Sequence, residues 1–184
     1  MAGSDEGDDV SGRGWAALDP GGTPGGHIYF QPSTGHDGSM LPPRLSAVTL
    51  GARDMRALRS FYLDLGWREL PGGSDAWSGF LLGGVLLTLY PLAALAAEAV
   101  AEPPPEGWSG VTLTVNVDSA GTVDEAFASA VAAGARAVAE PEDRSWGGRS
   151  GYIADPEGNR WEIAWAPGLA FDERGAVLRF GPGE

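Results

Sequence analysis

The sequence contains no cysteine and no lysine, and its only histidines are His27 and His36. Without cysteine, the chain cannot form disulfides, thiolate zinc sites or a cysteine nucleophile. Twelve arginines stand against 25 acidic residues, and the net charge of −13 argues against a nucleic-acid partner, because phosphates need Lys and Arg. No run reaches the roughly 18 apolar residues of a membrane span, and no secretory signal pattern is present. We therefore expect a cytoplasmic protein with no membrane or nucleic-acid partner.

The first 40 residues are rich in glycine and acidic side chains. They hold ten glycines, six acidic residues and one arginine, with almost no aliphatic residues. Such a segment cannot bury enough surface to offset the entropy of ordering, so we expect 1–40 to be a disordered leader. Its one strand-like run, 27–30, is too short to form a strand by itself. Both histidines fall in the leader, and Met40 is an alternative start of the protein.

Regular hydrophobic patterning begins near residue 44. A strand at 45–51 precedes Asp54, which caps a helix predicted over 55–65 by its apolar spacing and ended by Gly66. Three more strands, separated by glycine pairs, are expected at 67–70, 76–82 and 85–90.

The same order of elements returns in the second half. A strand at 110–117 precedes a capping box at 122–125, which predicts a helix to about residue 133, closed by Gly134. The next strands, of which the last two flank a tight turn at 155–159, are expected at 136–139, 150–154 and 160–165. The chain is thus predicted to be an α+β protein of two tandem βαβββ modules.

The segments outside the two modules also have distinct patterns. We place module one at 44–91, a linker at 92–108 and module two at 109–167. The linker opens with a short Ala-rich helix within 91–100 and continues into the stiff proline run at 103–105. Residues 168–184 are expected to form a short closing hairpin or tail.

Two sequence runs carry a family resemblance: V-T-L-G-A-R-D-M-R-A-L-R-S-F-Y-L-D-L-G-W at 48–67 and G-Y-I-A-D-P-E-G-N-R-W-E-I-A-W at 151–165. Together with the repeated order of elements, they resemble the vicinal oxygen chelate superfamily, which includes glyoxalase I, bleomycin-resistance proteins, fosfomycin-resistance enzymes and extradiol dioxygenases. The resemblance covers about residues 44–167. It implies that the modules curl into a mixed-sheet half-barrel around a cavity and that the protein forms a homodimer.

Strand alternation predicts which side chains line that cavity. Because successive side chains point to opposite faces, the apolar set packs on the helix and the polar set points inward. Glu162 is the single carboxylate among the inward residues, and we name it as the candidate catalytic residue. The candidate ligand-binding residues come from the inward sets and the glycine-rich loop at 146–151, and they are Thr49, Tyr90, Thr112, Thr114, Asn116, Trp146, Arg149, Tyr152 and Arg160.

Metal-using members of the superfamily place one ligand on each of four strands, typically His, Gln or Glu. By resemblance, these slots fall on Ala47, on Thr112 or Gly110, near Leu89 or Tyr90, and on Glu162. Only Glu162 is a ligand of the usual kind, and Zn²⁺, Fe²⁺ or Ni²⁺ needs about three or four donors. We therefore expect no cofactor, and a weak divalent-metal site at Glu162, Tyr90 and water is the alternative.

Two functions remain open, and both involve a small-molecule partner. The first is a binding protein without a metal centre, like the bleomycin-resistance branch, which sequesters a cationic or aromatic ligand. Residues 41–184 hold 19 acidic residues and 11 arginines, a net charge of −8 that attracts cations. The loop residues Trp77, Trp108 and Trp146 offer faces on which a flat ligand can stack.

The second function is a lyase, isomerase or dioxygenase that uses Glu162 as a general base or as part of the weak metal site. Tyr90, Tyr152 or Thr112 would then stabilise an oxyanion, and an arginine, Arg149 or Arg160, would hold an acidic group of the substrate. A simpler structural alternative is that Glu162 only forms an ion pair with Arg160.

Overall fold

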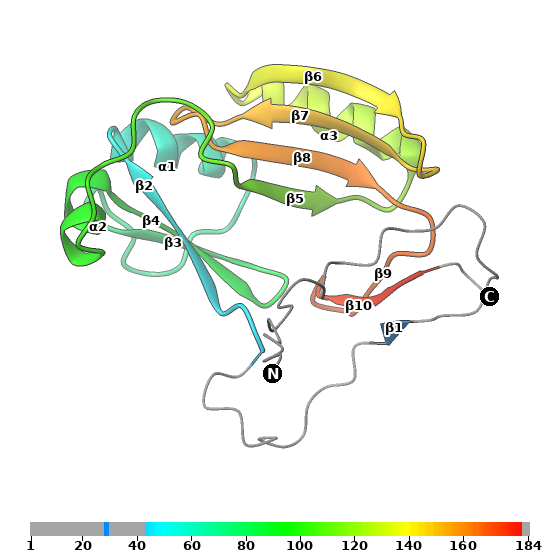
Figure 1. Cartoon of the computed structure of the whole chain (residues 1–184), viewed down its shortest axis with the longest axis horizontal. Coiled ribbons are helices and arrows are strands. Elements are labelled where there is room, and N and C mark those ends of the chain that lie inside the picture. Colours follow the sequence, from blue (N-terminus) through cyan, green and yellow to red (C-terminus); the bar gives the residue numbers. More distant parts are fainter. Residues whose placement is uncertain (1–27, 30–42, 182–184) are drawn as a thin grey trace, which may run out of the picture.

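The computed structural model describes residues 28–29 and 43–181, and within them two open mixed sheets lie next to each other (Figure 1). Sheet one has the order β2-β4-β3, with β2 parallel to β4 and β3 antiparallel to it. Its strands are β2 (Ala47–Ala52), β3 (Ser78–Leu82) and β4 (Val85–Pro91), and the helix α1 (Met55–Asp64) follows β2 in the chain. Asp54 caps α1 as predicted, since its Oδ1 accepts a hydrogen bond from the backbone N–H of Ala57 at 3.0 Å.

Sheet two has the order β5-β8-β7-β6, with β5 parallel to β8 and the other pairs antiparallel. Its elements are β5 (Thr112–Asn116), α3 (Ala120–Ala132), β6 (Arg136–Asp143), β7 (Arg149–Ala154) and β8 (Arg160–Trp165). In the chain segment that connects the two sheets, α2 (Leu92–Glu98) forms the expected short helix, which packs against β2 and β4 of sheet one. The predicted α+β class and the mixed sheets are confirmed, and the sheets stay open and do not close into a barrel.

The strand predicted at 67–70 does not form. Only a single bridge joins Glu69 to Phe80, with one backbone hydrogen bond from the N–H of Leu70 to the carbonyl of Gly79 at 2.8 Å. Pro71 follows and has no N–H to continue the ladder, so the pairing ends there. Sheet one therefore has three strands where sheet two has four.

The predicted capping box at 122–125 is also wrong. The N-cap of α3 is Ser119, whose Oγ accepts a hydrogen bond from the backbone N–H of Thr122 at 3.2 Å, and the helix begins at Ala120. Ser119 has the extended backbone of a cap, with φ −149° and ψ 159°. Thr122 and Glu125 consequently lie inside the helix.

All three helices end with the same pair of backbone hydrogen bonds. The first residue after the C-cap donates its N–H to the carbonyl three residues earlier, and the next residue donates to the carbonyl five residues earlier. In α1 and α3 the residue after the C-cap is Gly66 or Gly134, with φ of 82° or 105°, as the sequence predicts. In α2 this position is Val100, at φ 52°. A β-branched residue is unfavourable in this left-handed region, so α2 ends with local backbone strain.

One hydrophobic core joins the helix-facing sides of both sheets. At its centre, the fully buried Tyr62 of α1 donates a hydrogen bond to Asp155 Oδ2 at 2.7 Å and accepts one from Trp161 Nε1 at 3.0 Å. Burial, with Asp155 close by, raises the pKa of Tyr62 well above its ordinary value, so the hydroxyl remains a donor. Because Tyr62 comes from module one and its partners from module two, this trio links the two sheets.

A third, small sheet follows β8. It contains β1 (Ile28–Tyr29), β9 (Ala170–Phe171) and β10 (Val177–Phe180), so the predicted closing hairpin is present. β1 pairs with β10, so residues 28–29 of the predicted disordered leader form a short strand with a partner from the closing hairpin, whereas the rest of the leader lies outside the described residues.

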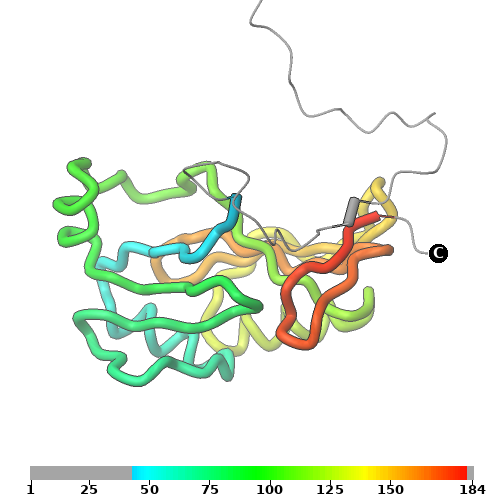
Figure 2. The backbone as a smooth tube through the Cα atoms, turned by 90° about the horizontal axis from the view of Figure 1, so that it is seen from below, coloured from blue at the N-terminus to red at the C-terminus, as the bar shows by residue number. Residues whose placement is uncertain are grey.

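The closing hairpin also meets sheet one. Figure 2 shows the turn between β9 and β10 beside the turn between β3 and β4, where a Cβ built on Gly83 would lie 2.7 Å from the carbonyl oxygen of Gly175. The C-terminal hairpin thus connects the end of module two back to module one. In the part of the chain that the structure describes, no helix is long and apolar enough to span a membrane.

Candidate functional site

The face of sheet two that points away from α3, here called the open face, holds Glu162 between two hydroxyl groups. Thr114 and Tyr152 lie opposite Glu162 on the neighbouring strands. The Tyr152 hydroxyl donates to Glu162 Oε1 at 2.8 Å, and the Thr114 hydroxyl donates to Oε2 at 3.2 Å. Burial and the hydrogen bond to Glu162 raise the pKa of Tyr152, which keeps it protonated as a donor. The carboxylate is thus held in place and has lone pairs left for a ligand.

Arg160 lies on the same face of β8, two residues and therefore about 7 Å before Glu162. Its guanidinium donates to the carbonyl oxygen of Gly158 at 3.0 Å. Among residues 28–29 and 43–181, no arginine forms an ion pair with Glu162. The structural alternative in which Arg160 neutralises Glu162 is therefore not found, and the carboxylate is available to an outside partner.

A cavity of about 520 Å³ opens beside Arg160, where the β2 edge of sheet one approaches the beginnings of β5 and β8. The chain between α2 and β5, whose course Figure 1 shows, supplies part of the lining with residues between Ala101 and Ser109. The cavity brings together Thr49, Arg160 and Trp108 from two strands and the linker. Trp108 is 62% exposed, and its Nε1 donates to the carbonyl oxygen of Val111 at 2.9 Å, which fixes the indole in the wall of the cavity.

The corresponding face of sheet one carries a second set of hydroxyls. Thr49 and Thr88 lie opposite each other on β2 and β4, with their Oγ1 atoms 2.7 Å apart. Tyr90 continues the same face, but its hydroxyl donates to Glu98 of α2 at 2.9 Å, and this hydrogen bond raises the pKa of Tyr90. The Tyr90 hydroxyl is thus engaged by the linker helix, whereas the hydroxyls that the described chain brings to Glu162 are those of Thr114 and Tyr152.

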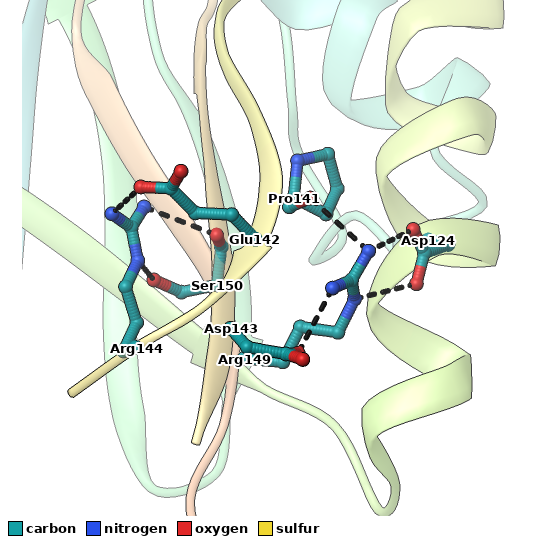
Figure 3. A network of polar contacts seen from close by, with 7 residues as sticks. All are labelled: Asp124, Pro141, Glu142, Asp143, Arg144, Arg149 and Ser150. Atoms are coloured by element: carbon teal, nitrogen blue, oxygen red, sulfur yellow. Dashed lines mark hydrogen bonds and ion pairs between the residues drawn. The ribbon is translucent and has the colours of Figure 1, made fainter. Parts of the chain in front are cut away.

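Arg149 lies on the α3 side of sheet two (Figure 3), whereas Glu162 is on the open face. Its Nε and NH2 groups donate to the two carboxylate oxygens of Asp124 on α3, at 2.8 and 2.7 Å, and NH1 donates to Asp143 at 3.0 Å. These hydrogen bonds raise the pKa of Arg149 and lower that of Asp124. Arg149 therefore ties β7 to α3. Strand alternation counted from Tyr152 would have placed it on this face.

Sequence reasoning missed Arg144, which lies on the same side as Tyr152. It donates to the hydroxyl of Ser150 at 2.9 Å and to its carbonyl oxygen at 3.1 Å, and it pairs with Glu142 (Figure 3). Its guanidinium carbon is 5.6 Å from the centre of the Tyr152 ring, within the range of a cation–π contact. Nothing in the sequence marked Arg144, because β6 was predicted to end at residue 139 and continues to Asp143.

The remaining candidates lie elsewhere on the sheets. Thr112 is exposed opposite Arg160, and Asn116 is half-buried opposite Ala164 at the far end of β5. The ring of Trp146 covers Gly148 near that far end and is 48% exposed, whereas the ring of Trp77 packs beside Gly79 in sheet one. Of the three loop tryptophans, Trp108 is thus the one that lines the cavity.

The family model described as the Glyoxalase/Bleomycin resistance protein/Dioxygenase superfamily matches residues 44–163. The chain belongs to this superfamily. A crystal structure of a glyoxalase-related enzyme from Fulvimarina pelagi is similar, with a TM-score of 0.69 and 26% identity over 74% of this chain and 97% of that one. No curated protein matches the sequence.

Two further solved structures show the same fold. A glyoxalase/bleomycin resistance protein/dioxygenase family enzyme from Burkholderia phytofirmans PsJN has a TM-score of 0.57 and 24% identity, over 66% of this chain and 97% of that one. Lactoylglutathione lyase from Agrobacterium tumefaciens has a TM-score of 0.54 and 22% identity, over 67% and 94% of the two chains.

The side chains at the superfamily's metal slots do not fit a divalent ion in this member. Ala47 and Thr112 supply no imidazole or carboxylate, and Leu89 is fully buried in the core. Glu162 stands alone with hydroxyl partners, and no group of three His, Cys, Asp or Glu side chains suited to a metal occurs in the described part of the chain. Hydroxyls and one carboxylate fall short of the three or four donors that such ions require.

Proposed function

We propose that this superfamily member binds a small cationic molecule, with Glu162 as the anionic contact, and holds it without chemical change. The observation that carries the proposal is a carboxylate fixed by Tyr152 and Thr114 on an open face and paired with no arginine of the described chain. A site that positions an acceptor in this way favours a ligand that brings positive charge or N–H donors.

The neighbouring cavity supports a ligand with an aromatic part. Its volume of about 520 Å³ falls within the usual range for small-molecule sites. Trp108 offers an indole face, on which a flat or cationic group gains stacking energy. Glu106 and Glu157 also line the cavity, and Glu157 is engaged by Arg53 at 3.6 Å.

The charge of the whole chain supports the same class of ligand. Residues 41–184 carry a net charge of −8, and the leader adds −5. A negative field raises the local concentration of cations and speeds their capture, most strongly at low ionic strength. Binding that weakens as salt is added is therefore expected.

The test is a titration with bleomycin, a cationic glycopeptide, followed by tryptophan fluorescence and by calorimetry. We expect saturable binding that is about tenfold weaker in Glu162→Gln, because one charge-assisted contact is lost. Glu125→Gln, which removes the same charge from the exposed side of α3, is the matched control and should bind like the native chain. No saturation at micromolar ligand, or equal affinity of the two variants, would contradict the proposal.

A second pair of variants tests the aromatic contact. Trp108→Ala should abolish most of the fluorescence change, because this indole lines the cavity. Trp146→Ala, which removes the exposed tryptophan at the other end of sheet two, should leave the change intact. The reverse result would show that the ligand binds outside the cavity, near Trp146.

One observation favours a second candidate, a lyase- or isomerase-type enzyme in which Glu162 is a general base. A carboxylate with a tyrosine hydroxyl 2.8 Å away combines a proton acceptor with a donor able to stabilise an oxyanion. The substrate pair to test is methylglyoxal with glutathione, given the name of the Agrobacterium relative. Turnover that disappears in Glu162→Gln while binding persists would support this candidate, and absence of turnover in the native chain would reject it for this substrate.

The homodimer implied by the resemblance and the cytoplasmic location remain predictions. Native mass spectrometry of the purified chain tests the first, and fractionation of the producing cell tests the second.

A further inference from the structure

A second cavity, of about 180 Å³, lies on the helix-facing side of sheet two, between α1 and α3. It is on the opposite side of the sheet from Glu162, so it is separate from the site described above. Its lining is mostly aromatic and aliphatic. The lining residues are Phe61, Tyr62, Leu65, Trp67, Val115, Ala126, Ser129, Ala130, Ile153, Trp161 and Ile163.

The polar atoms in this lining are nearly all engaged. The Tyr62 hydroxyl is bonded to both Asp155 and Trp161, and the Ser129 hydroxyl donates to the carbonyl oxygen of Glu125 at 2.9 Å. Among the lining side chains of the described chain, only the Trp67 N–H has no partner. A water molecule needs about two to four hydrogen-bonding partners, so an apolar occupant is favoured over water.

The size and the shape of the lining indicate what that occupant is. A core cavity of about 150 Å³ lined by apolar side chains is large enough for benzene. Here Trp67 and Trp161 meet edge to face, with ring centres 5.5 Å apart, and a third ring in contact with them would gain similar aromatic interactions. Ser129 is exposed and Leu65 is half-buried, so the rim of the cavity reaches solvent.

We propose that this cavity is a binding site for an uncharged molecule with a single aromatic ring. The occupant would contact α1 of module one together with α3 and β8 of module two. It would therefore stabilise the packing of the two modules as well as fill the volume between them.

The test uses benzene with the full chain, followed by two-dimensional NMR of the tryptophan indole N–H groups and by thermal unfolding. In the native chain we expect saturable shifts of the Trp67 and Trp161 signals and a higher midpoint of unfolding. In Ala126→Leu the affinity for benzene should fall about tenfold or more, because the added carbons occupy the cavity. The matched control is Ala128→Leu, the same change on the exposed face of α3, which should bind benzene like the native chain.

Other outcomes would overturn the site. Equal benzene affinity in Ala126→Leu and Ala128→Leu, or no saturable shift in the native chain, would show that the cavity takes no aromatic ligand. If Ala126→Leu does not fold, Ser129→Leu at the rim replaces it, with the same expected loss of binding. A chain that dimerises natively, becomes monomeric in the variants and never binds benzene would show that a second copy fills the cavity. Glu162→Gln should not alter benzene binding, which separates this test from that of the proposed function.

Discussion

Replacing Tyr62 by Phe removes one hydroxyl from the hydrogen-bonded trio that links the two modules. That hydroxyl is fully buried, donates to Asp155 at 2.7 Å and accepts from Trp161 at 3.0 Å. The ring itself is kept, including its stacking on Trp67, with ring centres 5.1 Å apart. The substitution therefore measures the two hydrogen bonds with little change in packing volume.

Both bonds contribute to the expected loss of stability. The buried Trp161 N–H would lose its acceptor, which costs about 1–3 kcal/mol, and a hydrogen bond to a carboxylate such as Asp155 contributes about 1.5–3 kcal/mol. Asp155 keeps its other donors, from Asn159 and Glu157. Because the two bonds share one hydroxyl, we expect a combined loss of about 2–4 kcal/mol, a large part of a typical domain's stability.

The loss should also depend on pH. Burial raises the pKa of Asp155 above its ordinary value, and the hydrogen bonds from Asn159 and Tyr62 lower it in part. A carboxyl group whose pKa is raised on folding contributes stability that is present at low pH and is lost as pH rises through the folded-state pKa. Removing the Tyr62 hydroxyl raises that pKa further. Tyr62→Phe should therefore lose more stability at about pH 7.5 than at about pH 4.5.

The assay is urea unfolding at both pH values, followed by tryptophan fluorescence and analysed by linear extrapolation. Tyr90→Phe is the matched control, because its hydroxyl also donates to a carboxylate, that of Glu98, but at the surface. We expect little change for the control. A loss below about 0.5 kcal/mol for Tyr62→Phe, as is usual for surface positions, would refute the role of the trio. So would a larger loss at the lower pH.

Three further predictions concern stability and binding. Val100→Gly should stabilise the chain by about 1 kcal/mol in urea unfolding, because Val100 is 93% exposed and adopts a left-handed backbone that glycine takes without strain; a loss would contradict the assigned strain. Gly83→Ala should lower the free energy of unfolding by about 1–3 kcal/mol more than Gly84→Ala, because both glycines have positive φ but only Gly83 faces the Gly175 carbonyl. Hydrogen exchange in the closing hairpin should also be faster in Gly83→Ala, and equal effects of the two substitutions would argue against the contact. Arg149→Lys should lower the midpoint of thermal unfolding and leave the affinity for bleomycin unchanged, since this side chain holds α3 on sheet two. Weaker bleomycin binding with unchanged stability would instead show that Arg149 contacts the ligand.

Much of the fold follows from local pattern. Apolar spacing and Gly66 predicted α1 to within one residue of its observed end, and alternation placed Thr114, Tyr152 and Glu162 on one face. These features depend on the period of the helix or strand and on neighbouring residues, so sequence is enough to predict them. Pro71 ends the pairing that a strand at 67–70 would need, the N-cap of α3 is Ser119 and not residue 122, and β6 continues four residues beyond its predicted end at 139. These errors, like the placement of Arg149 among the ligand-binding residues, depend on single residues and on contacts that the periodic pattern does not contain.

The sequence alone determined the chemistry available to the protein. The lack of cysteine, and of histidine after residue 40, leaves Glu162 as the single usual metal ligand among the predicted slots. The tertiary structure decided how those groups are used, because it depends on contacts between residues far apart in the chain. Tyr62 and Asp155 are 93 residues apart yet share a hydrogen bond, and Thr114 reaches Glu162 across 48. The packing of α3 on the strands likewise decides which carboxylates are paired with an arginine. Asp124 is paired with Arg149, whereas Glu162 has no arginine partner in the described chain.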